Sequence, residues 1–220
     1  MVYNITFFAG LHYTGVGLGT AIAIGSSPLW AGLLQAAVQR NRLQRLWWLG
    51  SCVSVLGGFL MAWGKAPHLT APWLGIALCL LAGLAYGAYA VISQPLLLGC
   101  GIARVNAWVF ACAACMAVPI AVLLGGLPSI DAQSGLVVLY LGMIATGLAY
   151  LLFSIGLRSV SAATCVALSK LEPITAFALS IYIVGEAPSG LALSGLVIVL
   201  AGLWMVILSE MRHSKAVEVR

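Results

Sequence analysis

The stretch LSKLEPITAFALSIYIVGE, residues 168–186, contains two ionisable side chains inside a segment that is otherwise apolar enough to cross a bilayer. They are Lys170 and Glu172, and an ionised side chain at the centre of a membrane costs roughly 2.5 to 3.5 kcal/mol even on lenient insertion scales. Such residues therefore usually face a cavity or a partner. Because they are two residues apart on a helix, they point to nearly opposite sides, and we do not expect them to pair with each other.

The same stretch contains Pro173, which has no amide hydrogen. The carbonyl of Ser169, four residues earlier, should lose its helical partner and become available to bind something else. Two interpretations remain open. The segment is a proline-kinked helix with a neutral glutamate and a lysine buried against other helices, or it is one wall of a functional cavity. The depth of the charges in the segment favours the cavity.

Composition places the chain among integral membrane proteins. Of its 220 residues, 63% are hydrophobic and 7% are charged, and its mean hydropathy is +1.11, far from the values of soluble domains. The formal net charge of +5 could suggest nucleic acid. However, the basic residues lie in short loops and at the C-terminus, as the positive-inside rule predicts. We therefore expect the lipid bilayer as a partner and no nucleic acid.

The sequence predicts neither a disulfide framework nor a metal site. Most of the six cysteines lie within apolar segments, which is unlike the framework of a small secreted protein. Cys112 and Cys115 form a C-x-x-C motif, but within an apolar helix we expect them to be small packing residues. The histidines lack metal-ligand spacing. We expect no cofactor, and no nucleophile–base motif indicates an enzyme.

Eight apolar segments can be marked, and all but the first are near or above the ~20 residues that a spanning helix requires. They are residues 1–13, 14–38, 46–64, 73–97, 103–125, 134–157, 161–184 and 189–209. The densest basic cluster follows the second segment and is assigned to the cytoplasm; it consists of Arg40, Arg42 and Arg45. Alternation from there places the tail, residues 210–220 ending in Arg220, in the cytoplasm. The loops expected outside contain Lys65, Asp131 and Glu186.

An internal repeat becomes visible when the chain is shifted by 145 residues. The matching pairs are Pro28 and Pro173, Ala31 and Ala176, Leu34 and Leu179, Gly50 and Gly195, and Gly57 and Gly202. In the topology above, the two copies enter the membrane from opposite sides. Inverted repeats with proline-interrupted helices are typical of secondary transporters whose site lies at the repeat interface.

The two copies differ at the charged positions, where Gly25 corresponds to Lys170 and Ser27 to Glu172. Pro28 should free the carbonyl of Ile24, as Pro173 frees its counterpart. Glycines at recurring spacing should let the helices pack closely rather than bind a nucleotide; they are Gly50, Gly57 and Gly64, Gly83 and Gly87, and Gly195 and Gly202.

Other polar residues form faces at helical spacing on the apolar segments. Hydrogen bonding between helices explains any one of them singly, whereas their joint occurrence favours a wet central cavity. They are Thr146, Tyr150 and Ser154 in the sixth segment, Tyr86, Tyr89 and Ser93 in the fourth, and Thr164, Leu168, Glu172 and Ala176 in the seventh.

Residues 140–206 resemble the second half of an EamA-type transporter of the drug/metabolite transporter superfamily. The matching motifs are LGMIATGLAY at residues 141–150, GLRSVSAAT at 156–164, LEP at 171–173 and GE at Gly185 and Glu186. In the first part of the chain, SSP at residues 26–28 resembles the end of the family's first repeat. LLAGLAYGAYAV, residues 80–91, resembles the start of its second repeat.

The resemblance implies an all-α polytopic membrane protein of the ten-helix type, with two inverted five-helix repeats around a central cavity. Residues 1–64 would be the C-terminal part of the first repeat, which is therefore incomplete, and residues 72–209 the complete second repeat. The chain would supply the equivalents of helices three to ten. We expect the two missing crossings in upstream sequence, in a separate polypeptide or in a second copy.

The predicted function is secondary transport, most simply the export of a small metabolite or amino acid across a bacterial inner membrane by alternating access. Lys170 would pair a substrate carboxylate or phosphate, and Glu172 would exchange a proton during the cycle. Tyr86, Tyr89, Thr146, Tyr150 and Ser154 would line the pathway, and Pro28 and Pro173 would kink their helices. The alternatives are a channel-like passive pore and a truncated membrane protein that does not transport.

Overall fold

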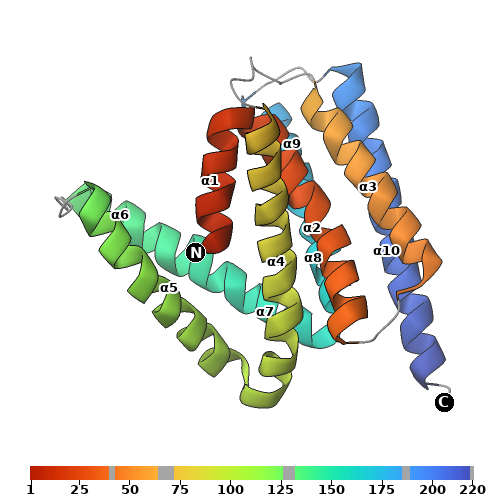
Figure 1. Ribbon diagram of the computed structural model, residues 1–220. Helices are drawn as coiled ribbons and strands as arrows, with labels where there is room; N and C mark the ends of the chain where they lie inside the picture. Colours follow the sequence, from red (N-terminus) through yellow and green to blue (C-terminus); the bar gives the residue numbers. More distant parts are fainter. Residues whose placement is uncertain (40–42, 64–71, 126–131, 185–188, 219–220) are drawn as a thin grey trace. The chain divides into compact units, whose positions relative to one another are not determined.

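The computed structural model describes residues 1–39, 43–63, 72–125, 132–184 and 189–218, and within them it contains helices and no strand (Figure 1). The helices are α1 (Val2–Thr14), α2 (Val16–Val38), α3 (Arg45–Trp63), α4 (Pro72–Cys100), α5 (Ile102–Gly125), α6 (Ala132–Tyr140), the π-helix η1 (Leu141–Leu148), α7 (Ala149–Ser159), α8 (Ala162–Leu168), α9 (Leu171–Leu179), the π-helix η2 (Ser180–Val184) and α10 (Gly190–Glu218). The predictions that concern Arg40, Arg42, Gly64, Lys65, Asp131, Gly185, Glu186 and Arg220 lie outside the described residues.

The predicted all-helical membrane architecture is confirmed. Each apolar segment of the sequence is helical, with α6, η1 and α7 forming the sixth and α8, α9 and η2 the seventh. Within the described ranges, six helical stretches are long and apolar enough to cross a membrane: Val16–Val38, Trp73–Cys100, Ile102–Leu123, Ser134–Ser159, Ala162–Ile183 and Gly190–Arg212. The apolar part of α3 is shorter, at Arg45–Met61.

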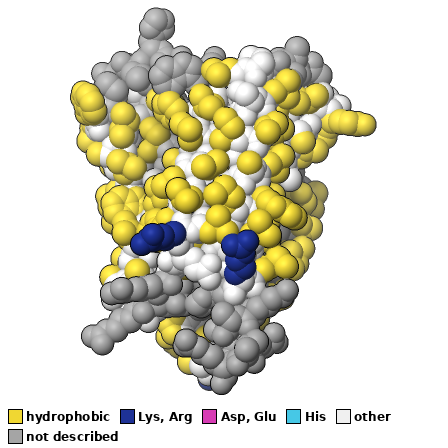
Figure 2. Space-filling view, turned by 90° about the vertical axis from the view of Figure 1, so that its right-hand side faces the viewer, with side chains coloured by type: hydrophobic (Ala, Val, Ile, Leu, Met, Phe, Trp, Pro, Cys, Tyr) yellow, Lys and Arg dark blue, Asp and Glu magenta, His cyan; other side chains and the backbone are white. Residues whose placement is uncertain are grey.

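Hydrophobic side chains cover the outside of these helices. Trp73 is 83% exposed, Leu123 85% and Tyr182 93%. Figure 2 shows one face, where hydrophobic side chains dominate and Lys and Arg side chains are sparse. Soluble proteins rarely expose apolar patches larger than a few hundred Å², so lipid is the natural partner of these surfaces. Cys112 and Cys115 are also exposed, and the prediction that they pack within the protein is wrong.

The chain forms two compact units, Ile92–Ser159 with Met1, and Val2–Val91 with Val160–Arg220. In the first, α5 packs against α7. In the second, α3 packs along α10, and α2 packs against α1, α3 and α8. Two tight connections need glycine, because Gly15 between α1 and α2 has φ 76° and Gly101 between α4 and α5 has φ 83°.

Glycines bring α3 and α10 into backbone contact in an antiparallel pair. A β-carbon at Gly50 would lie 2.7 Å from the carbonyl oxygen of Gly202, and one at Gly57 would lie 2.7 Å from the carbonyl oxygen of Gly195. Real β-carbons do not come this close to backbone atoms, so only glycine fits. The predicted packing role of these glycines is confirmed.

These contacts cross the two copies of the repeat. Gly50 corresponds in sequence to Gly195 but touches Gly202, and Gly57 corresponds to Gly202 but touches Gly195. Such an exchange is what a two-fold axis between the copies would produce. The arrangement of whole five-helix repeats stays a prediction.

The glycines of α4 play the same part against α2. A β-carbon at Gly83 would lie 2.7 Å from the carbonyl oxygen of Ala23, and one at Gly87 would lie 2.8 Å from the backbone nitrogen of Ala31. Helix α2 is thus held between α4 and α3, and its buried face includes Ser27 and Pro28.

Candidate functional site

The seventh apolar segment is broken at Ser169 and Lys170, between α8 and α9. The backbone amide of Lys170 donates to the carbonyl of Ala167 at 3.2 Å, and that of Glu172 donates to the carbonyl of Ser169 at 3.0 Å. Both bonds span three residues, as in a tightened turn. Pro173 follows in the first turn of α9, where a missing amide hydrogen costs little. The prediction of a free Ser169 carbonyl is therefore wrong.

The matching proline has a different surrounding. Helix α2 runs without a break through Pro28, and the carbonyl of Ile24 accepts a hydrogen bond from the hydroxyl of Ser27 at 2.8 Å. The carbonyl that proline leaves without a helical partner is thus satisfied within its own helix. The prediction that this carbonyl is available to a ligand is also wrong.

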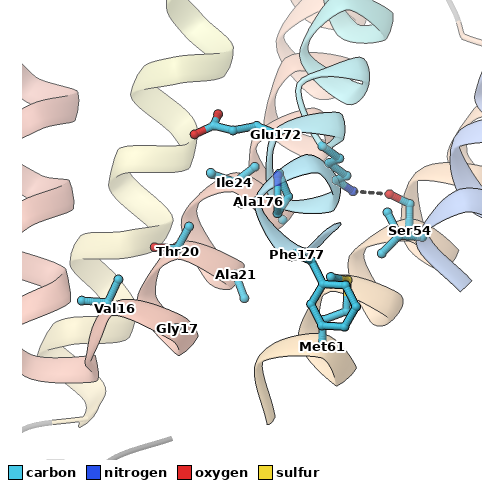
Figure 3. Close-up of a pocket in the computed structure, with 15 residues that line it drawn as sticks. Val16, Gly17, Thr20, Ala21, Ile24, Ser54, Met61, Glu172, Ala176 and Phe177 are labelled. Carbon is cyan, nitrogen blue, oxygen red and sulfur yellow. Dashed lines mark hydrogen bonds between the residues drawn. The ribbon is translucent and has the colours of Figure 1, made fainter. Parts of the chain in front are cut away.

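Lys170 is the buried charge of the site. Its side chain is 3% exposed, and its Nζ donates a hydrogen bond to Oγ of Ser54 at 2.7 Å, the dashed line in Figure 3. Ser54 lies on α3 and is 1% exposed. A β-carbon at Gly202 would lie 2.5 Å from the backbone nitrogen of Ser54, so close packing of α10 fixes this part of α3. The ammonium is held by a neutral partner.

Lys170 and Glu172 line one cavity of about 340 Å³. Figure 3 shows the Glu172 carboxylate extending away from Ser54, so the two charges diverge as predicted. The polar members of the lining are Thr20, Ser54, Lys170 and Glu172. The apolar and glycine members are Val16, Gly17, Ala21, Ile24, Gly25, Gly58, Met61, Pro173, Ala176, Phe177 and Val199.

Corresponding positions of the two copies meet in this cavity. Gly25 and Lys170, 145 positions apart, both line it, and so do Ser54 and Val199. At this pair of positions, the second copy of the repeat contributes the cation of Lys170 to the cavity. The first copy contributes Gly25, which has no side chain and leaves space.

The two predicted tyrosines of α4 lie outside the cavity lining. Tyr86 places its hydroxyl 2.7 Å from Oγ of Ser169, at the break between α8 and α9, and its ring is 5.8 Å from that of Tyr3. Tyr89 is half-buried in the same helix. Tyr86 thus contacts the segment that carries Lys170 without lining the cavity itself. Its part in a pathway stays a prediction.

The predicted residues of the sixth segment belong to the other compact unit. Ser154, fully buried, donates to Oδ1 of Asn106 at 3.0 Å, and the ring of Tyr150 packs edge-on against Phe110 at 5.1 Å. Both contacts are with α5. Thr146 lies in η1 and is half-buried. For Tyr150 and Ser154 the helix-to-helix interpretation therefore holds, and a role in transport stays a prediction.

Sequence reasoning missed a polar cluster at the start of α8. Oε1 of Glu210 accepts a hydrogen bond from the backbone amide of Ser161 at 2.9 Å. Its Oε2 accepts bonds from the hydroxyls of Ser161 at 3.0 Å and Thr164 at 2.6 Å. Thr164 also accepts a bond from Nε1 of Trp47 at 3.0 Å. The predicted shared face of Thr164 and Glu172 is wrong, because Thr164 is buried in this cluster whereas Glu172 is exposed and lines the cavity.

Gln35 of α2 completes this cluster. Its Oε1 accepts a hydrogen bond from the backbone amide of Ala163 at 2.9 Å, and its side chain is fully buried. At the start of α8, the amide of the N-cap residue Ser161 is thus satisfied from α10 and that of Ala163 from α2, while the amide of Thr164 donates to Oγ of Ser161 at 3.3 Å. The sequence carried little signal for it, because a glutamate at a segment end looks like a solvated charge.

Comparisons with known proteins agree with this architecture. The EamA-like transporter family matches residues 73–208. The protein named "Uncharacterized transporter YwfM", from Bacillus subtilis (strain 168), is 33% identical over 217 residues, covering 98% of this chain and 72% of that protein. One solved crystal structure has a TM-score of 0.77 at 21% identity, covering 94% of this chain and 73% of the other, which shows the fold alone. The chain belongs to the EamA-like transporter family and is a multi-pass membrane protein.

Proposed function

We propose that this transporter moves a small metabolite or amino acid with an anionic group, and that the cavity around Lys170 is its binding site. The observation that supports this most directly is the hydrogen-bond partner of Lys170 within the described residues, which is a serine hydroxyl and not a carboxylate. A buried ammonium next to a neutral group retains most of the penalty of leaving water. A substrate carboxylate or phosphate would provide the missing charge.

Glu172 is the proposed proton-exchanging group. It lines the same cavity and, unlike Lys170, is exposed, so its carboxylate would be within reach of a proton that enters the cavity. Among the described residues that line the cavity, Glu172 is the one that can carry a negative charge, and protonation would remove it. The binding of an anion near Lys170 and of a proton at Glu172 would then favour each other.

Alternating access is supported by the positions of the cavity and the polar cluster along α2. The residues of α2 that line the cavity lie between Val16 and Gly25, whereas Gln35, near the other end of this helix, belongs to the cluster around Glu210. In the proposed topology the cluster is at the cytoplasmic end and the C-terminus is cytoplasmic, in a bacterial inner membrane. Outward transport would require the cluster to open.

Transport in proteoliposomes tests this proposal. We expect the protein to catalyse saturable counterflow of a labelled anionic metabolite or amino acid drawn from a screened panel, because a carrier exchanges bound substrate across the membrane. Substitution of Lys170 by methionine should strongly reduce counterflow at substrate concentrations near the wild-type KM, because the substrate then binds more weakly. Flux that rises linearly with concentration, without counterflow, would identify a passive pore instead.

A further inference from the structure

We propose that the cavity takes small organic anions with an apolar body, and that Gly25 and Gly58 set the length of the body that is accepted. This deepens the proposed function and rests on it, because the anionic group is placed at Lys170. The inference is carried by the chemistry of the lining and by the space next to these two glycines.

The head of the ligand follows from Lys170 and Ser54. An ammonium has three donor hydrogens, and the hydroxyl of Ser54 takes one of them at 2.7 Å. The lysine side chain is 3% exposed, so little water is available to satisfy the others. A carboxylate can accept from such a donor and match its charge. A neutral or cationic head cannot do both.

The body of the ligand follows from the rest of the lining. Ile24, Met61 and Phe177 contribute apolar surface, together with alanines and glycines. A volume of about 340 Å³ is near the lower end of the roughly 300–1,000 Å³ seen for ligand pockets. The site therefore suits one small ring or short chain attached to the anionic head, and not a large amphiphile.

Two glycines of the lining differ from the packing glycines of the same helices. A β-carbon at Gly58 would meet no atom within 4 Å, and one at Gly25 would have Cγ1 of Val55 as its nearest neighbour, at 3.9 Å. At Gly57, the preceding residue, a β-carbon would lie 2.6 Å from the backbone nitrogen of Val199. Helix packing therefore explains Gly57 but does not explain Gly25 or Gly58.

Space next to Gly25 and Gly58 is then space for the ligand. A side chain at either position would enter the cavity without first meeting the backbone of a neighbouring helix. It would shorten the longest ligand that fits and leave the head group at Lys170 untouched. The two glycines thus act as specificity-determining residues for the size of the ligand.

Isothermal titration of the protein in lipid nanodiscs tests the proposal with benzoate, phenylacetate, 3-phenylpropionate and 4-phenylbutyrate. For the wild type we expect affinity to rise roughly fourfold for each added methylene that is buried, until the cavity is full. Gly25→Leu and Gly58→Leu should remove this rise for the longer acids and leave benzoate within about twofold. Gly99→Leu is the matched control, because its β-carbon also meets nothing within 4 Å and it is not in the lining.

Further variants separate the anion site at Lys170 from the size limit set by the two glycines. Lys170→Met should weaken all four acids alike, and wild-type affinity in this variant would overturn the anion site and the proposed function with it. An unchanged series in both leucine variants, with Lys170 still required, would overturn the size proposal alone. If a leucine variant fails to fold, Gly25→Ala and Gly58→Ala replace it. These variants should weaken the binding of 4-phenylbutyrate more than that of the shorter acids. The proposal would also be overturned if the glycine variants lost the same affinity for all four acids, or if the wild type bound none of them.

Discussion

At the scale of single residues, Lys170 has no counterpart in the first copy of the repeat, where Gly25 stands. Its ammonium is buried beside a neutral hydroxyl, which is an unfavourable arrangement unless an anion visits the site. Recognition of the anionic group therefore depends on a single charge. Substitutions of Lys170 should weaken substrate binding far more than they lower the stability of the fold.

The first prediction concerns the charge of Lys170. Lys170→Ala should raise the KM for efflux by about 10- to 100-fold, because a charge-assisted hydrogen bond contributes roughly 1.5–3 kcal/mol. The amount of membrane-inserted protein should not fall, since removal of a charge does not hinder insertion. Initial efflux rates at several substrate concentrations measure the effect, with Arg212→Ala, outside the cavity lining, as the control. Unchanged kinetics in Lys170→Ala would count against the site.

The second prediction concerns Glu172. Glu172→Gln keeps the shape of the side chain but cannot exchange a proton, so substrate counterflow should continue while uptake or efflux driven by a pH gradient is lost. Counterflow and gradient-driven flux are measured in the same proteoliposomes, with and without a protonophore. Gradient-driven flux at the wild-type rate in Glu172→Gln would remove this residue from the coupling mechanism.

At the scale of helices, the break at Ser169 and Lys170 divides one membrane crossing into parts with different surroundings. Helix α8 is tied at its start by Glu210 and Gln35 and is almost entirely buried. Helix α9 has no buried residue and contributes Ala176 and Phe177 to the cavity. Movement of α9 relative to α8 therefore needs fewer contacts to change than movement of α8 itself.

The third prediction concerns the anchoring of α8. Thr164→Val should lower the free energy of unfolding by about 1–3 kcal/mol, because Trp47 loses an acceptor and Glu210 a donor in a buried setting. For a chain of this length this corresponds to roughly 2–12 °C in the thermal midpoint, followed in detergent. Ser194→Ala, at an exposed hydroxyl that bonds only within its own helix, should leave the midpoint unchanged. A comparable drop in both variants would show that the loss in Thr164→Val does not come from the hydrogen bonds of this cluster.

The fourth prediction concerns the contact of α3 with α10. Gly57→Ala should destabilise the protein by about 1–3 kcal/mol through overpacking, because its β-carbon would meet the backbone of α10. Gly58→Ala places the same methyl group one residue later, where nothing lies within 4 Å, and should be tolerated. Thermal midpoints of the two variants, compared side by side, measure the difference. Equal midpoints would show that α10 yields easily.

At the scale of the whole molecule, hydropathy predicted the helices well because each apolar run ends at glycine, proline or charge. It could not place the break of the seventh segment, since Pro173 lies three residues beyond Lys170, inside the first turn of α9. The helical spacing of Tyr150 and Ser154 is the same whether these side chains contact α5 or a water-filled cavity. Periodicity alone therefore could not decide between the two. The cluster around Glu210 joins residues more than a hundred positions apart, and no local pattern reports such a contact.

The fifth prediction concerns the orientation of the chain in the membrane. Because Lys and Arg are concentrated in the loops assigned to the cytoplasm, a reporter fused after Arg220 should be found in the cytoplasm and one inserted near Asp131 outside. Paired fusions that are active on one side only, such as alkaline phosphatase and green fluorescent protein, give the location. Both reporters on the same side of the membrane would contradict the proposed topology and the inverted repeat.

The crossed contacts of Gly50 with Gly202 and of Gly57 with Gly195 limit how the two halves can diverge. A surface whose positions exchange partners in this way is one that a single ancestral hairpin could use to bind a second copy of itself. A substitution that adds a side chain at one of these glycines on α3 requires a compensating change on α10. The sequence of this contact should therefore change slowly, with paired substitutions on the two helices. The cavity has no such constraint, which is why one half can hold Lys170 while the other keeps Gly25. Descendants of such a protein could acquire new substrates through substitutions in one half alone, without disturbing the contact between α3 and α10.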